Sequence, residues 1–253
     1  MNTRHWIAHF ENNRRGRVEP DWSASFTLPE RKRTHLARSL AEYQLGDGGG
    51  ECRLVARDAD KFRTSIPGMN RLVDLWFAEE REHSRLLTGA VRRVGGTFVT
   101  TTPAMSLFYA VRRALGVEFE LLVLLIVEIV STVYYRSIRK HVGDAPLAAM
   151  CRLIIRDEAG HVAFHRERVA AQFPGGVPGG WVLRFHALGF ACACFLWLGK
   201  NGACLRALGT TRAEFFRQIR AGLLRFEGGI ARRLRCCAPA ARSVALNEIN
   251  PVP

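Results

Sequence analysis

The chain has 253 residues, of which 48% are hydrophobic, so it can bury a sizeable core and is not a disordered polypeptide. Its 37 lysines and arginines outnumber 23 acidic residues, and the formal net charge of +14 fits nucleic acid, an anionic membrane surface or an acidic partner. We interpret this charge as a solvated, arginine-rich surface and expect no specific nucleic-acid binding. Seven cysteines, with no Cys-x-x-Cys pair, argue against a disulfide framework or a zinc ribbon.

Residues 1–26 interleave arginines with Trp6, Phe10 and Trp22 without a regular period. We interpret them as a basic N-terminal arm that is mobile and at most partly docked. The segment lacks the apolar stretch of a signal peptide, and together with the unpaired cysteines this predicts a cytoplasmic protein.

The first predicted helix begins at Thr27-Leu28-Pro29-Glu30, a capping-box pattern with proline in the first turn. Its inward stripe places Asp47 among apolar residues, where a carboxylate needs a partner or a cation. The glycines on both sides of Asp47 either break the helix or allow close packing. The stripe consists of Leu36, Leu40, Tyr43, Asp47, Gly50 and Leu54.

Three more helices follow with apolar stripes at helical spacing. The second runs from about Met69 to Ala90, and Thr102-Pro103 opens the third, whose apolar stretch is interrupted by acids and is therefore no membrane span. The fourth starts after Asp144 and ends at the breaker-rich residues 172–180. The stripes are Leu72, Trp76, Glu80, His83 and Leu87; Leu121, Leu125, Glu128, Thr132 and Tyr135; and Leu147, Met150, Ile154, Glu158, His161 and His165.

Two further helices are expected between residues 181 and 235. The fifth, from Trp181 to about Leu208, contains an uncharged run of 13 residues, Ala187 to Gly199, and is predicted to be packed or interfacial rather than membrane-spanning. Thr211-Arg212-Ala213-Glu214 is a second capping box, which opens a basic amphipathic helix that packs on the bundle or lies on a membrane surface. Residues 238–253 are expected to be a flexible tail.

Two short motifs carry the chemistry: Glu79-Glu80-x-x-His83 and Asp157-Glu158-x-x-His161. In each, the second acid and the histidine lie one helical turn apart on one face. Two such helices, with one inward acid from each of two others, form the ligand set of a di-iron or di-manganese site in a ferritin-like four-helix bundle. The predicted metal ligands are Asp47, Glu80, His83, Glu128, Glu158 and His161, with Glu51 as the alternative to Asp47.

Several neighbours of these ligands are candidates for supporting roles. Metal-bound histidines are usually oriented by a second acid, so we expect Asp157 to reach His83 and Glu79 to reach His161. Three weaker candidates share the stripes: His165 as an extra ligand, a base or a core histidine, and Tyr43 and Tyr135 as hydrogen-bonding or packing residues.

The segments that carry these residues resemble the bacterial ferritin-like domain proteins of the ferritin-like di-iron carboxylate superfamily. The resemblance covers about Pro29 to Phe173 and implies a four-helix bundle over residues 27–173 with a dinuclear iron site. Members usually carry glutamate in the first helix, so Asp47 departs from the pattern. The similar segments are Tyr43-Gln44-Leu45-Gly46-Asp47, Phe77-Ala78-Glu79-Glu80-x-x-His83, Glu128-Ile129 with Tyr134-Tyr135-Arg136, and Arg156-Asp157-Glu158-x-x-His161.

The sequence therefore predicts an all-α protein: a ferritin-like bundle with two additional C-terminal helices. The leading hypothesis is an oxidase or oxygenase that uses two iron ions, or manganese or a mixed pair, with O2, a small-molecule substrate and an external electron donor such as a ferredoxin. The alternatives are a ferroxidase that handles iron, and a non-catalytic, metal-stabilised protein at a membrane surface. A homodimer is compatible with each of these three functions.

Overall fold

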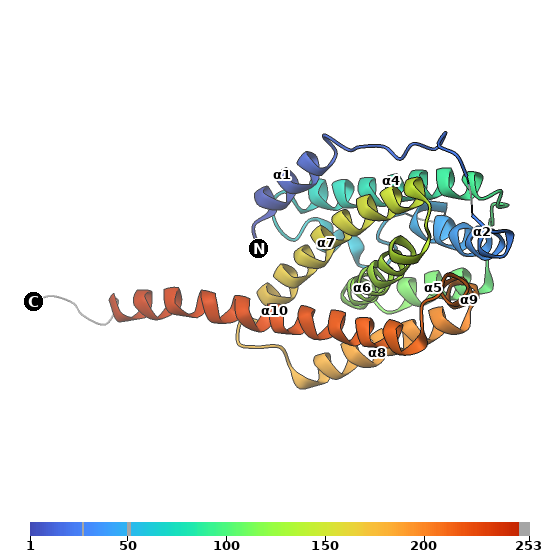
Figure 1. Cartoon of the computed structure of the whole chain (residues 1–253). Helices are drawn as coiled ribbons and strands as arrows, with labels where there is room; N and C mark the ends of the chain where they lie inside the picture. Colours follow the sequence, from blue (N-terminus) through green and yellow to red (C-terminus); the bar gives the residue numbers. More distant parts are fainter. Residues whose placement is uncertain (27, 50–51, 248–253) are drawn as a thin grey trace, which may run out of the picture.

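The computed structural model describes residues 1–26, 28–49 and 52–247. Over these ranges the chain forms ten α-helices, one π-helical turn and no strand, which confirms the predicted all-α class. Figure 1 shows a helical body from which the last helix projects. The elements are α1 (Thr3–Asn13), α2 (Glu30–Gln44), η1 (Leu45–Gly49), α3 (Ala59–Arg63), α4 (Met69–Arg93), α5 (Pro103–Ala114), α6 (Val117–His141), α7 (Ala145–Gln172), α8 (Gly179–Leu198), α9 (Lys200–Leu208) and α10 (Arg212–Asn247).

The four helices predicted to carry the site, α2, α4, α6 and α7, lie together in the body (Figure 1). α6 packs along α7, α2 packs along α4, and α4 also contacts α7. Their inward stripes are buried, as the helical spacing of the apolar residues requires. Fully buried members of these stripes include Leu36, Leu40, Leu72, Leu87, Leu121, Leu125, Leu147, Met150 and Ile154.

Side-chain caps begin the helices at the predicted places. Thr102 Oγ1 accepts a hydrogen bond from Met105 N at 3.1 Å, and Asp144 Oδ1 accepts one from Leu147 N at 3.0 Å. The first bundle helix instead begins after Pro29 without a side-chain cap. The capping residue proposed there, Thr27, lies outside the described residues.

Two predicted helices are each divided. The third is two helices, α5 and α6, because Gly116 between them adopts φ +81°, a conformation that interrupts a helix and favours glycine. The fifth becomes α8 and α9, which meet at Gly199 in an extended conformation. The extension after the bundle therefore holds three helices, α8 to α10, rather than two.

Residues 3–13 and 238–247 are more ordered than the sequence suggested, whereas residues 248–253 of the expected tail lie outside the described residues. Residues 3–13 form α1, which packs on α4 and α7 with Trp6 and Phe10 buried, in place of a mobile arm. At the other end, α10 continues to Asn247, through most of the segment expected to be a flexible tail. In Figure 1 this last part of α10 extends beyond the body without a neighbour.

α8 packs on α6, α9 and α10 along one face. Among the described helices it alone is long and apolar enough to cross a membrane by length and composition, and only 28% of its apolar window is buried. Its place beside the body fits the predicted packed or interfacial helix.

Candidate metal centre

Three long helices bring five of the predicted ligands to one place inside the body. α4 supplies Glu80 and His83, and α7 supplies Glu158 and His161, in each case from adjacent turns of one helix face. Both histidines are fully buried, and Glu158 is almost so. α6 adds Glu128, so side chains from three long helices meet in the interior.

His161 lies at the centre of one half of the cluster, which we call the His161 half. Its Nδ1 is 2.9 Å from Glu128 Oε2, 3.1 Å from Glu80 Oε1 and 3.4 Å from Glu158 Oε2. Glu80, Glu128 and His161 each place one possible ligand atom within 4.8 Å of the others. One ring nitrogen therefore faces three carboxylates from three helices.

In the second half, which we call the His83 half, the carboxylate oxygens lie farther from the imidazole nitrogen. His83 Nδ1 lies 3.6 Å from Glu80 Oε2 and 3.8 Å from Glu158 Oε1. Glu80 and Glu158 therefore belong to both halves: each directs one oxygen toward His161 and the other toward His83. The two imidazole rings have centroids 5.8 Å apart. This is the arrangement expected of two carboxylates bridging a pair of cations.

The outer nitrogen of each histidine contacts the acid that precedes the glutamate of the opposite motif. His161 Nε2 lies 3.1 Å from Glu79 Oε2, and His83 Nε2 lies 3.3 Å from Asp157 Oδ2. These are the two cross-helix contacts expected from the sequence. A carboxylate accepts the N–H of each ring, which turns the other nitrogen, Nδ1, toward the centre of the cluster.

Asp157, the acid that contacts His83 Nε2, also contacts two arginines. Arg17 Nη2 lies 2.8 Å from Asp157 Oδ2, and Arg156 Nη2 lies 2.9 Å from Asp157 Oδ1. The Arg17–Asp157 pair is buried, with side-chain exposures of 8% and 0%. Arg17 was missed by sequence analysis because it lies in a segment with no regular period, 140 positions before its partner in the chain.

Asp47 occupies the π-helical turn η1 rather than the end of a regular helix. Tyr135 Oη donates a hydrogen bond to Asp47 Oδ2 at 3.0 Å, so this candidate tyrosine does contact a candidate ligand. Tyr43 instead stacks on Tyr134, with ring centroids 3.9 Å apart, and packs against Tyr135. The alternative ligand Glu51 lies outside the described residues.

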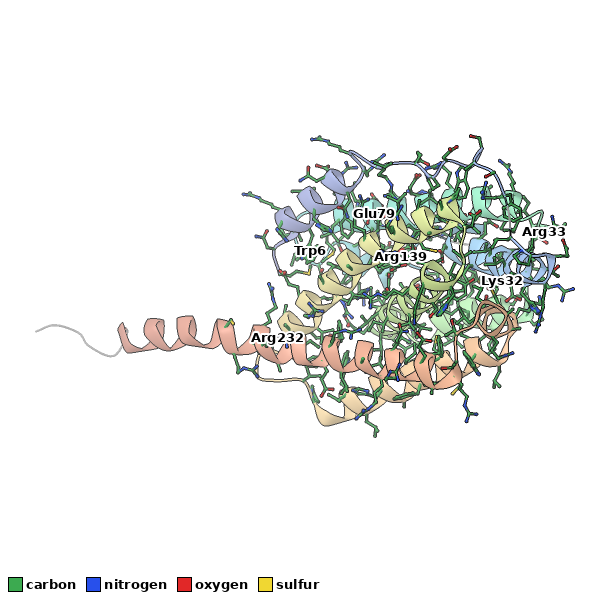
Figure 2. The ribbon with its side chains drawn as sticks, viewed as in Figure 1. Trp6, Lys32, Arg33, Glu79, Arg139 and Arg232 are labelled. Atoms are coloured by element: carbon green, nitrogen blue, oxygen red, sulfur yellow. The ribbon has the colours of Figure 1, made fainter. Side chains whose placement is uncertain are left out.

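Aromatic side chains close the site on the α1 side. Phe10 of α1 and Trp76 pack on the His161 ring, with ring centroids 5.7 Å and 5.9 Å from it. The candidate His165 is fully buried against Trp76 and Phe164, and neither of its ring nitrogens has a hydrogen-bond partner among the described residues. In Figure 2, Trp6 on α1 and Glu79 on α4 lie in the same part of the molecule, where α1 covers the bundle.

The electrostatics show that the cluster needs positive charge. Burial, with the charge of Glu80, raises the pKa of Asp47 to about 8. Burial and the nearby Glu128 raise the pKa of Glu158 well above its usual value. Burial alone would lower the pKa of the imidazoles, but the surrounding carboxylates hold the pKa of both His83 and His161 well above the ordinary range. The site thus retains protons at neutral pH, and these are the protons that a bound cation displaces.

The unsatisfied atoms of the cluster point to the same requirement. Glu80 Oε1, Glu158 Oε2 and His83 Nδ1 are buried and have no hydrogen-bond partner among the described residues. A single Nδ1 also cannot donate to three carboxylates at once, as the geometry around His161 would demand. Carboxylate oxygens with one imidazole nitrogen in each half form a donor set that suits iron or manganese. The residues present therefore fit a dinuclear metal centre.

Comparison with protein families, with curated proteins and with solved structures found no match to this chain. The assignment of the site therefore depends on its own geometry and chemistry.

Proposed function

We propose that this protein is a ferritin-like four-helix bundle that binds two iron or manganese ions and oxidises a substrate with O2. The observation that carries the proposal is the shared orientation of Glu80 and Glu158, each with one oxygen toward each histidine. His161 and Glu128 would complete one metal position, and His83 and Asp47 the other. Metal binding gives this cluster a place in a protein interior, because two cations would offset the repulsion between the buried carboxylates.

Bound at this site, two iron ions would supply O2-dependent oxidation chemistry, with electrons from an external donor. The residues of the chain would perform three tasks. Glu79 and Asp157 hold the imidazole rings in one orientation and one tautomer. Phe10 and Trp76 keep water from the His161 ring. Glu80, whose side chain is 15% exposed, is more accessible to solvent than Glu128, Glu158 and the two histidines.

The first test is the metal content of the full chain after anaerobic loading with ferrous or manganous ion. We expect about two ions per chain, and their loss in the double variant Glu80→Ala/His161→Ala. O2 consumption by the ferrous protein should then depend on the same residues. A protein that folds but takes up no metal under these conditions would contradict the proposal.

A second candidate is iron oxidation itself, with ferrous ions as the substrate. It is favoured by the burial of the ligands: His83 and His161 are fully buried, and Glu128 and Glu158 are only 5% and 4% exposed. Ferrous ions and O2 are small enough to reach a buried site that larger molecules cannot. Repeated turnover of added ferrous ion beyond two per chain would support iron oxidation, whereas O2 uptake that stops after two ions and resumes with an organic substrate would support the oxygenase.

A further inference from the structure

The outer face of α8 is apolar from one end to the other. One side of the helix packs on the body, with Gly189 against Leu223 of α10 and Trp197 stacked on Phe215 at 5.3 Å. The opposite side faces solvent and contains no charged residue after Arg184. This outer stripe, which we call the α8 stripe, consists of Leu183, Ala187, Ala191, Cys194, Phe195 and Leu198.

The exposure of the large members is unusual for a protein surface. Leu183 is 71% exposed, Phe195 68% and Leu198 82%. They lie on one face of the helix, about 120° wide and about 22 Å long, and α8 forms an outer edge of the molecule in Figure 1. Single exposed leucines are common, but an apolar face on an edge indicates a surface that something covers.

Arginines border this stripe. Arg184 follows its first residue in the chain. On α10, Arg220 lies about 20° around the helix from Glu227, on the flank that faces α8, and Arg217 lies about 80° from Glu227, farther toward solvent. The flank is identified by two contacts: Leu223 packs on Gly189, and Glu227 Oε2 lies 3.0 Å from His186 Nε2. Leu224, 45% exposed, continues the apolar surface onto α10. All three arginines are exposed.

We propose that α8 seats the protein on an anionic membrane surface, with the α8 stripe at the acyl-chain boundary and the three arginines among the lipid headgroups. An apolar stripe bordered by arginine is the composition of helices that lie in the plane of the interface. The net charge of +14 draws the whole molecule toward an anionic surface. A second copy is a poorer fit, because a twofold contact through the stripe would bring the arginine borders of both copies together.

The test is sedimentation of the full chain with phosphatidylcholine vesicles that contain or lack phosphatidylglycerol. We expect binding to the anionic vesicles and at least about tenfold weaker binding to the neutral ones. The variant Leu183→Ser/Phe195→Ser/Leu198→Ser should bind the anionic vesicles on the order of a hundredfold less. Arg217→Gln/Arg220→Gln should lose about fivefold per arginine.

The matched control replaces two exposed leucines elsewhere, Leu107→Ser in α5 and Leu115→Ser directly after it, which are 66% and 58% exposed. This variant should bind vesicles like the unmodified protein, and circular dichroism with thermal unfolding should show that all variants are folded. Equal vesicle binding by the α8 stripe variant would overturn the proposal. So would a dimer, seen by sedimentation velocity without lipid, that the stripe variant abolishes while the unmodified protein ignores vesicles.

Discussion

The two halves of the candidate metal centre are built from the same motif but are not equivalent. His161 Nδ1 has three carboxylate oxygens within 3.4 Å, whereas the nearest two around His83 Nδ1 are at 3.6 and 3.8 Å. The third acid differs too: Glu128 comes from the middle of a long helix, and Asp47 from a π-helical turn flanked by glycines. Ligands on regular helices are positioned more rigidly than a short side chain in an irregular turn. We therefore expect two metal positions of unequal affinity, the tighter one at His161.

The largest effect should come from the glutamates shared by the halves. Glu158→Ala removes an oxygen from both positions, so the metal content should fall from about two ions per chain to nearly none. Glu128→Ala, which affects only the His161 half, should leave about one. Elemental analysis after anaerobic loading measures both, and Glu82→Ala, an acid of α4 paired with Arg85 outside the cluster, is the matched control. Equal losses in Glu128→Ala and Glu158→Ala would mean that the halves do not share their glutamates.

A smaller effect is expected from lengthening the short acid. Asp47→Glu extends the carboxylate by one methylene toward the His83 half, and should bring the two binding constants closer together. Anaerobic calorimetric titration with manganous ion resolves the two steps, and Tyr135→Phe, which removes the hydrogen bond to Asp47, tests whether its present orientation matters. If both steps were already equal in the unmodified protein, the proposed asymmetry would be wrong.

The buried arginine behind His83 should have an effect confined to one half. Arg17→Ala leaves Asp157 with a single cationic partner and loosens its hold on His83, so metal affinity at the weaker step should fall about tenfold. Arg17→Lys should recover part of it, and Arg15→Ala, an exposed neighbour, should change nothing. An equal loss at both binding steps would indicate general destabilisation instead of positioning.

The last prediction concerns the metal-free protein and pH. The pKa of Asp47 is raised from 3.8 to about 8, so between these values the folded chain holds a proton that the unfolded chain has lost. This contribution to stability is complete below about pH 4 and disappears as pH rises through about 8. Urea unfolding in a chelator should therefore show stability that declines toward pH 8, and Asp47→Asn should flatten this decline. A steeper decline in Asp47→Asn would assign the titration to other groups.

Local sequence pattern predicted the parts of the fold that depend on local interactions. The helical spacing of the stripes, the caps at Thr102 and Asp144, and the inward placement of Glu80, His83, Glu158 and His161 all follow from periodicity and turn chemistry. The same spacing could not show the division at Gly116, because the apolar pattern continues on both sides of a residue whose positive φ depends on packing.

The parts of the site that were missed depend on contacts between distant segments. The sequence of α1 has no continuous apolar stripe from which a packed helix could be predicted. Trp6 and Phe10 are buried because α4 and α7 provide the surface on which α1 packs. Arg17 was missed for the same reason. The cross-helix contacts of Glu79 and Asp157 were predictable because both ends lie in repeated motifs whose helices must face each other.

The docking of α1 also bears on when the site is completed during synthesis. Asn2 N donates a hydrogen bond to Glu167 Oε1 at 2.7 Å, and Trp6 Nε1 donates one to Glu167 Oε2 at 3.2 Å. α1 is synthesised before α7, so it cannot make these two contacts until α7 has also left the ribosome. Until then the half-made chain exposes its acidic and histidine side chains to water, where any metal would bind loosely. Stable metal loading thus requires both that α7 has been synthesised and that α1 has docked on it.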